Sequence, residues 1–362
     1  MRKLHLLMYA MLAMFFVACS SDDNTSDGVE IVGNYTNGIF VVNEGNFGTG
    51  NSDVSFIDAN FSSVDNNIFS DANQGQALGD VAQSITLYED LAFVVVNNSD
   101  KVAVVDRHTF ELISTVEGQL SLPRYMAISN GKGYITNWDE NDDAYVSVVD
   151  LETYTVTETI DVDFGPEKII EKDGRVYVAH QGGFGQNNKL TVIDTNSDSV
   201  IDVLEVGDVP NSLQIVGNDL WVLAGGNPSW AATGETDGKL VKIDMGSLEI
   251  TQEFDFEGVS ASLLEYDQGR LYYTVSITDW DTYETEAHVF AFDPNSTSLP
   301  TESVFSTDRA FYGAAIKDGM YFGGDAKDYA SDGSVVIYDL ENGEQLYEFT
   351  VGITPNGFYF TE

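Results

Sequence analysis

Apart from its many acids, this sequence has few residues of the types that carry out catalysis. The 362-residue chain contains 59 Asp and Glu, 16 Lys and Arg, four His and one Cys. A general acid–base pair needs two carboxyl groups in one partly desolvated site, and so many acids single out no pair. Beyond the N-terminal segment the histidines are His108, His180 and His288, and His180 ends a predicted strand from which it could reach a binding face. No nucleophile-elbow serine motif occurs. We therefore expect no catalytic residues, with a secreted lactonase or hydrolase as an alternative.

Two acidic segments could supply oxygen ligands for calcium. One is residues 139–143, and the other holds Asp279 and Asp281. Closely spaced carboxylates suit Ca²⁺, but neither segment has the EF-hand spacing. Such clusters also arise by chance in so acidic a chain, so we expect no cofactor or metal and keep calcium as an alternative.

Composition excludes several classes of protein. A formal net charge of −43 argues against nucleic-acid binding, because phosphate contacts need clustered Lys and Arg. A single cysteine excludes an intramolecular disulfide framework, a Cys-rich zinc site and a Cys-ligated iron–sulfur cluster. Aromatic residues at 12% and apolar residues at 43% are sufficient for a packed core.

The N-terminus has the pattern of an export signal. Arg2 and Lys3 precede 14 almost wholly apolar residues, Leu4–Val17, which are too few for a membrane span of about 20 residues. A charged start followed by a short apolar stretch predicts a secretory signal peptide. We assign it to residues 1–18.

One pattern recurs seven times in the rest of the chain. An alternating apolar segment ends each time in aspartate, as in Val102–Asp106 and Leu190–Asp194. The seven aspartates lie 48, 44, 44, 50, 49 and 46 residues apart: Asp58, Asp106, Asp150, Asp194, Asp244, Asp293 and Asp339. Repeats of about 40–50 residues are typical of propeller blades.

Each repeat has the composition of a four-stranded sheet. A second apolar run precedes the aspartate segment, and a turn and a further strand such as Val200–Val206 follow it. The first repeat lacks an innermost strand, and Val351–Phe360 resembles the start of another repeat at Val206–Leu213. We therefore predict an all-β, seven-bladed β-propeller over residues 38–362, closed by the C-terminal strand. An open solenoid or two sandwiches are the alternatives.

Bulky aromatic residues concentrate in loops that the blade scheme places on one face. Trp138, Trp230 and Trp280 lie between the second and third strands of their repeats, whereas Trp221 lies within a strand and should be in the core. Exposed aromatics with polar neighbours usually mark a binding surface, although each could instead pack under its own loop. The candidate ligand-binding residues are Trp138, Trp230, Trp280, Tyr125, Arg124, Asn227, Tyr283, Phe311, Tyr312 and Tyr329.

Residues 16–23 resemble a bacterial lipoprotein signal. Phe16-Val17-Ala18-Cys19 is similar to the lipoprotein cleavage box, which implies lipid attachment at Cys19 and a polar, flexible tether over residues 19–37. Ser20-Ser21-Asp22-Asp23 resembles the surface-export signal of Bacteroidota lipoproteins. The resemblance implies an outer-membrane protein facing outward, held at the membrane by its lipid alone. The periplasmic face is the alternative.

Two further resemblances concern the repeats. Tyr134-Ile135-Thr136-Asn137 and the stretch from Val192 to Asn211 are similar to the YVTN family of β-propeller repeats. Asn43-Glu44-Gly45-Asn46-Phe47 looks like a motif of the surface lipoproteins that capture vitamin B12 and related corrinoids for a TonB-dependent transporter. This implies a non-catalytic corrinoid-binding protein. A glycan-binding or protein-docking propeller is an alternative.

Overall fold

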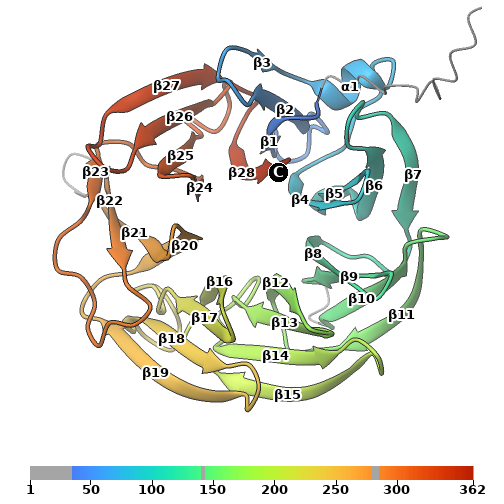
Figure 1. The fold of residues 1–362 in the computed structure, drawn as a ribbon. Coiled ribbons are helices and arrows are strands. Elements are labelled where there is room, and N and C mark those ends of the chain that lie inside the picture. The colour runs from blue at the N-terminus through green and yellow to red at the C-terminus, as the bar shows by residue number, and fades with distance from the viewer. Residues whose placement is uncertain (1–34, 140–142, 279–284, 362) are drawn as a thin grey trace, which may run out of the picture. The chain divides into compact units, whose positions relative to one another are not determined.

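Seven four-stranded antiparallel sheets form a ring (Figure 1). The computed structural model describes residues 35–139, 143–278 and 285–361. The arrangement confirms the predicted seven-bladed β-propeller. None of the helices in the described ranges is long and apolar enough to cross a membrane.

The strands of each blade run in order from the centre of the ring outward. The innermost strands of blades 1 to 7 are β28 (Pro355–Phe360), β4 (Ala82–Tyr88), β8 (Pro123–Ser129), β12 (Pro166–Lys172), β16 (Pro210–Val216), β20 (Ala261–Asp267) and β24 (Gly313–Lys317). The second strands are β1 (Gly38–Asn43), β5 (Leu91–Val96), β9 (Lys132–Asn137), β13 (Arg175–His180), β17 (Asp219–Ala224), β21 (Arg270–Thr278) and β25 (Met320–Asp325).

The outer half of each blade is built in the same way. The third strands are β2 (Asp53–Asp58), β6 (Lys101–Asp106), β10 (Tyr145–Asp150), β14 (Lys189–Asp194), β18 (Gly238–Asp244), β22 (Thr285–Phe292) and β26 (Ser334–Asp339). The fourth are β3 (Val64–Asp65), β7 (Leu112–Glu117), β11 (Thr155–Asp161), β15 (Ser199–Glu205), β19 (Glu249–Phe256), β23 (Phe305–Thr307) and β27 (Gln345–Thr350). A short helix α1 (Ile68–Ala72) and a 3₁₀ turn η1 (Asn97–Ser99) complete the described elements.

The core lies between neighbouring blades and fills mainly from the second and third strands. These strands are near-continuous apolar runs because both of their faces are covered by adjacent sheets. Trp221 of blade 5 is fully buried, and its ring centroid lies 5.5 Å from that of Phe292 in blade 6. This confirms that Trp221 is a core residue.

Six of the seven recurring aspartates end a third strand, Asp293 directly follows one, and each holds the turn that comes next. The Asp194 carboxylate accepts hydrogen bonds from the backbone N–H groups of Asn196 and Ser197, both at 3.0 Å. Asp150 and Asp244 make the same pair of bonds in their own blades. At Asp58 desolvation favours the neutral acid, but the hydrogen bonds that the carboxylate accepts together outweigh it and lower the pKa to about 2. The repeated aspartate is therefore a turn-forming residue.

The C-terminal strand closes the ring. Antiparallel pairing joins β28 to β1, with Ile39 opposite Phe360 and Val41 opposite Phe358. Phe358 is also buried against residues of blade 7, with its ring 6.1 Å from that of Phe322. The first blade is thus completed by the end of the chain, as the sequence predicts.

Strand register defines two ends of the ring. Pro123, Asn137 and Tyr145 pair at one end of blade 3, where the loop between the second and third strands lies. We call this end, with the loops between second and third strands and the connections into the inner strands, the loop face. The chain enters β1 at the other end, where Gly38 pairs with Asp58. Tyr35, within the segment expected to be a tether, packs there against Phe56 and Phe110.

Closure predicts a large stability cost for truncating the C-terminal strand's anchor. Phe358→Ala should lower the free energy of unfolding by about 3 kcal/mol, because it removes a buried aromatic ring and leaves a cavity between the last blade and the first. Phe47→Ala is the matched control, since that ring is 79% exposed. Denaturant unfolding measures both, and similar small losses would mean that the C-terminal strand contributes little to closure.

Candidate functional site

A repeated backbone device presents the first residues of the inner strands at the loop face. The residue before the strand has a positive φ in five blades: Val81, Leu122, Gly165, Val209 and Thr354. In four of these blades its carbonyl accepts a hydrogen bond from the residue that follows the second strand, as from Trp138 N–H to Leu122 O at 3.3 Å. In blade 4 the donor to Gly165 O is Gly182, two residues after that strand. Each loop is thereby fixed to the start of its inner strand. Side chains just after that start gather around the centre of the ring.

A buried ion pair joins blades 3 and 4 at this face. Arg124 of β8 donates from Nε and Nη2 to the two carboxylate oxygens of Glu167 in β12, both at 2.9 Å. The guanidinium carbon also lies 4.0 Å from the Trp138 ring centroid, and Phe184 meets the same indole edge-on at 5.7 Å. Bidentate pairing and cation–π contact fix the indole and the guanidinium together. The Trp138 Nε1–H is buried and has no hydrogen-bond partner among the described residues.

The neighbouring inner-strand residues form a second polar group. Gln83 Nε2 donates to the Tyr125 hydroxyl at 3.2 Å. The Lys168 ammonium lies 3.8 Å from the centroid of the same tyrosine ring. These contacts run from blade 2 through blade 3 to blade 4.

A third group connects blades 7 and 1. The Tyr312 hydroxyl and Asn356 Nδ2 donate to the Glu44 carboxylate at 3.1 and 2.7 Å. Tyr312 meets Tyr329 edge-on at 5.7 Å, and Asn46 Nδ2 donates to the Tyr329 carbonyl at 3.0 Å. Burial raises the pKa of Glu44 although both hydrogen bonds oppose the shift. Asn356 also donates to the backbone of Gln83, so this group is continuous with the previous one.

The structure brings together five of the sequence-predicted residues and places Phe311, Asn227 and Trp230 apart from them. Arg124, Tyr125 and Trp138 form one contiguous set, which the Asn356 and Gln83 amides join to Tyr312 and Tyr329. Phe311 packs inward, with its ring 5.5 Å from that of Tyr321 and 6.2 Å from that of Tyr338. Trp280, Tyr283 and Cys19 lie outside the described residues, as do Asp279, Asp281 and residues 140–142 of the acidic segments.

Asn227 and Trp230 occupy a separate part of the loop face, on blade 5. Asn227 is buried and donates to Asp208 and Thr233, both at 3.2 Å. It lines two shallow cavities of about 770 and 440 Å³, the second shared with Phe164 of the neighbouring blade. Trp230 projects from the same loop and is 77% exposed.

Exposed aromatic side chains concentrate on this face. Among the described residues, eight Phe, Tyr or Trp side chains are exposed: Phe47, Phe164, Phe184, Trp230, Tyr266, Tyr312, Tyr329 and Tyr347. All except Tyr266 and Tyr347 belong to loops of the loop face, from blades 1, 4, 5 and 7 and the connections into blades 4 and 7. Stable proteins leave few large aromatics in water without a use for them, so the face has the character of a binding surface.

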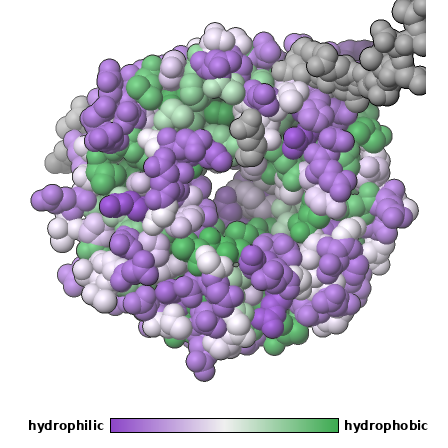
Figure 2. All heavy atoms as spheres, viewed as in Figure 1, coloured by the Kyte–Doolittle hydropathy of each residue, from purple (hydrophilic) through white to green (hydrophobic). Residues whose placement is uncertain are grey.

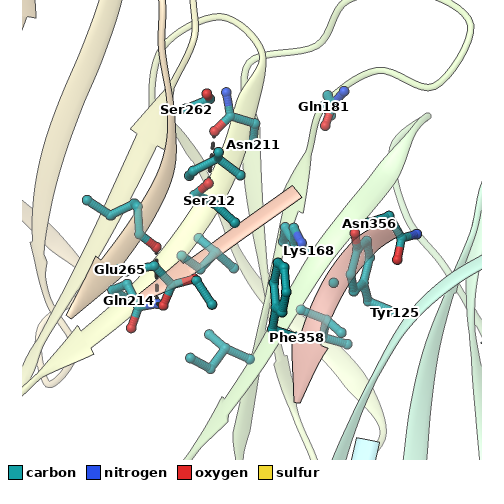
Figure 3. Close-up of a pocket in the computed structure, with 18 of the residues that line it drawn as sticks. Tyr125, Lys168, Gln181, Asn211, Ser212, Gln214, Ser262, Glu265, Asn356 and Phe358 are labelled. Atoms are coloured by element: carbon teal, nitrogen blue, oxygen red, sulfur yellow. Dashed lines mark hydrogen bonds between the residues drawn. The ribbon is translucent and has the colours of Figure 1, made fainter. Parts of the chain in front are cut away.

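Beneath this face lies a polar cavity of about 460 Å³, which we call the channel cavity. It is lined by inner strands of six blades, and the labelled side chains in Figure 3 converge on it. An opening remains at the centre of the ring when all heavy atoms are drawn (Figure 2). The lining of the channel cavity includes Lys168 of blade 4, Gln214 of blade 5 and Glu265 of blade 6.

Glu265 is the residue that brings a carboxyl group to the cavity lining, and its pKa is strongly shifted. Desolvation raises its pKa to about 7, although Lys168 and the Gln214 amide favour the ionised form. Gln214 Nε2 donates to the carboxylate at 3.1 Å. Sequence reasoning missed these residues. The signal was present as polar side chains inside otherwise apolar inner strands, as in Asn211-Ser212-Leu213-Gln214.

His180 ends β13 at the loop face, but its side chain is buried and is not available there for binding, which corrects the expectation from sequence. Its ring is fully buried, with Nε2 2.8 Å from the Thr191 hydroxyl. Burial lowers its pKa to about 4, so the imidazole is neutral at physiological pH. The part of the chain that the structure describes holds no group of three His, Cys, Asp or Glu side chains that could bind a metal.

Comparison with known proteins identifies the family. Residues 37–360 match the family described as a domain of unknown function, DUF5074, and the chain belongs to it. No curated protein sequence matches the chain.

Several solved structures share the fold. Kuenenia stuttgartiensis hydrazine synthase is 18% identical, with a TM-score of 0.58, over 78% of this chain and 92% of that one. BamB from Moraxella catarrhalis is 15% identical, with a TM-score of 0.50, over 86% and 82%. Dihydro-heme d1 dehydrogenase NirN is 11% identical, with a TM-score of 0.53, over 90% and 75%. At these identities the similarity shows the propeller fold alone.

The raised pKa of Glu265 predicts a pH-dependent stability difference. In the unfolded chain the pKa of this carboxyl is near 4.5. Below that pH Glu265 is protonated in both the folded and the unfolded state, so no charge is buried on folding. Above about pH 7 both states are ionised, and the folded state bears the full desolvation cost. We compare the free energy of unfolding of Glu265→Gln with that of the unsubstituted protein. The difference should change by about 2 kcal/mol in favour of Glu265→Gln as the pH rises from about 5 to about 8.5.

Denaturant unfolding at several pH values measures this difference. Glu152→Gln, on an exposed turn, is the control and should show no such trend. A pH-independent difference for Glu265→Gln would mean that this carboxyl keeps its ordinary pKa in the folded protein.

Proposed function

We propose that the protein is a non-catalytic binding module that captures a small-molecule nutrient at its loop face. The observation that carries this proposal is the concentration of exposed aromatic side chains on that face, next to fixed amide, carboxylate and guanidinium groups. Broad apolar contact with a few oriented polar groups is the usual composition of a small-molecule site.

The proposed ligand is a corrinoid such as vitamin B12. A corrin ring is large and flat and has many amide substituents. Exposed rings such as Trp230, Phe184 and Tyr329 offer apolar contact, and Asn227 and Asn46 lie beside exposed aromatics as amide partners. The resemblance of Asn43–Phe47 to the corrinoid-capturing lipoproteins supports the same ligand and adds a TonB-dependent transporter as the receiving partner.

The other candidate functions predict different ligands. A glycan-binding propeller would stack sugars on the same exposed rings, and a docking module would bury them against a protein. An enzyme would be expected to use Glu265, because a carboxyl group with a pKa near 7 suits general acid–base catalysis. The aromatic loop face and the channel cavity that contains Glu265 are thus separable by experiment.

Calorimetric titration of the purified protein with cyanocobalamin tests the proposal. We expect saturable binding, and Trp230→Ala should weaken it by about tenfold, which is about 1.4 kcal/mol, by removing an aromatic contact. Because Trp230 is 77% exposed, its removal should leave the melting temperature nearly unchanged.

Tyr266→Ala is the matched control for this titration. Tyr266 is an exposed aromatic outside the loop face, so its loss should leave cyanocobalamin affinity as it was. Absence of both binding heat and thermal shift at high micromolar cyanocobalamin would remove corrinoid as the ligand. Binding of an oligosaccharide instead would favour the glycan alternative.

We further propose that a lipid on Cys19 anchors the protein to the outer membrane, facing outward. Acyl chains on one cysteine hold a protein firmly when more than one is present. Cys19→Ala should therefore move the protein from the membrane fraction to the soluble fraction, and wild-type protein on intact cells should be cleaved by added protease. Membrane retention of Cys19→Ala would contradict the anchor, and protection from protease would indicate the periplasmic face.

A further inference from the structure

The channel cavity has a lining that differs in kind from the loop face. Its volume of about 460 Å³ falls within the usual range for small-molecule sites. Hydroxyl, amide and charged groups from different blades point into it: Ser212, Ser262, Gln181, Asn211, Lys168 and Glu265 (Figure 3). A polar interior of this size holds water or a polar ligand.

Two opposite charges face this cavity without pairing. Lys168 comes from blade 4 and Glu265 from blade 6, and their closest described partners are Tyr125 and Gln214 rather than each other. Glu265 is nevertheless near enough for the ammonium to favour its ionised form. Lys168 and Glu265 thus both line the channel cavity.

Neither charge is satisfied by another ionic partner among the described residues. Lys168 contacts the face of the Tyr125 ring, and Glu265 accepts a hydrogen bond from Gln214. Charges inside a protein are normally paired, since leaving them unpaired is costly.

We propose that the channel cavity is a second binding site, for a small zwitterionic amino acid whose carboxylate meets Lys168 and whose ammonium meets Glu265. A ligand carrying one charge would satisfy one of these residues and be repelled by the other. A zwitterion can pair with both residues, and it has no net charge when it enters the cavity. The site is separate from the loop face, and its existence does not depend on corrinoid binding there.

The proposal fixes the direction of the pH dependence. Glu265 must be ionised to bind an ammonium group, and its pKa is raised to about 7 by burial. Zwitterion affinity should therefore rise as the pH increases through about 7 and fall as it decreases. Affinity thus increases with pH, whereas the ionisation of Glu265 lowers the stability of the unliganded protein as the pH increases.

Titration with ω-amino acids of increasing length tests this site. The probes are glycine, 3-aminopropionate, 4-aminobutyrate and 5-aminopentanoate, measured by calorimetry on the purified protein at about pH 6 and about pH 8. We expect saturable binding that is strongest at one chain length and tighter at the higher pH. Butyrate and butylammonium, which each carry one charge, should bind at least about tenfold more weakly than the best zwitterion.

Substitutions assign the binding to the two charges. Lys168→Met and Glu265→Gln should each weaken the best zwitterion by at least about tenfold. Lys317→Met is the matched control, because Lys317 also belongs to an inner strand but lines a different cavity. It should leave the affinity unchanged, and circular dichroism with thermal melts confirms that every variant is folded.

The outcomes separate this proposal from the function of the loop face. Trp230→Ala should not alter zwitterion binding, so failure of cyanocobalamin to bind would leave this proposal standing. The channel-site proposal is overturned if none of the four zwitterions binds at millimolar concentration. It is also overturned if butyrate or butylammonium binds as tightly, or if folded Lys168→Met and Glu265→Gln both bind normally.

Discussion

The pairing of the chain's last strand with its first supports every other feature of this molecule. β28 supplies the innermost strand of blade 1, so the hydrogen bonds between β28 and β1 turn seven successive sheets into a ring. Closed rings leave only short, protected strand edges. Without this pairing Asn356 would not reach Glu44 and Gln83, and the contacts that connect blade 7 to blade 2 across blade 1 would not exist.

The ring converts a repeated sequence into a surface whose positions are not equivalent. The same backbone device begins five of the inner strands, yet the side chain after it is Gln83 in one blade, Arg124 in the next and Glu167 in the third. Hydrogen bonds and ion pairs between neighbouring blades then fix these different side chains relative to one another. A uniform scaffold thereby presents a specific arrangement of charge and aromatic area at one end.

Local sequence patterns predicted the fold because each pattern has a local physical cause. The strand-ending aspartates recur because each carboxylate holds its own turn, and the apolar runs recur because each is covered on both faces. The loop position of Trp138 and Trp230 followed from the same repeat. Whether an aromatic residue at a loop end turns inward was beyond this reasoning, since Phe311 packs beneath the face whereas the adjacent Tyr312 is exposed.

The channel cavity was not predicted because its residues meet only once the ring is formed. Lys168 and Glu265 lie on strands of different blades, and neither has an unusual local neighbourhood in the sequence. Their environment is produced by blades that approach one another around the centre.

The chain enters β1 and leaves β28 at the end of the ring opposite the loop face, where Gly38 lies beside Thr361. An attachment made next to Gly38 or Thr361, such as an affinity tag or a sensor-chip linker, therefore joins the ring at the end opposite the loop face. The aromatic surface lies at the other end of the ring from Gly38 and Thr361.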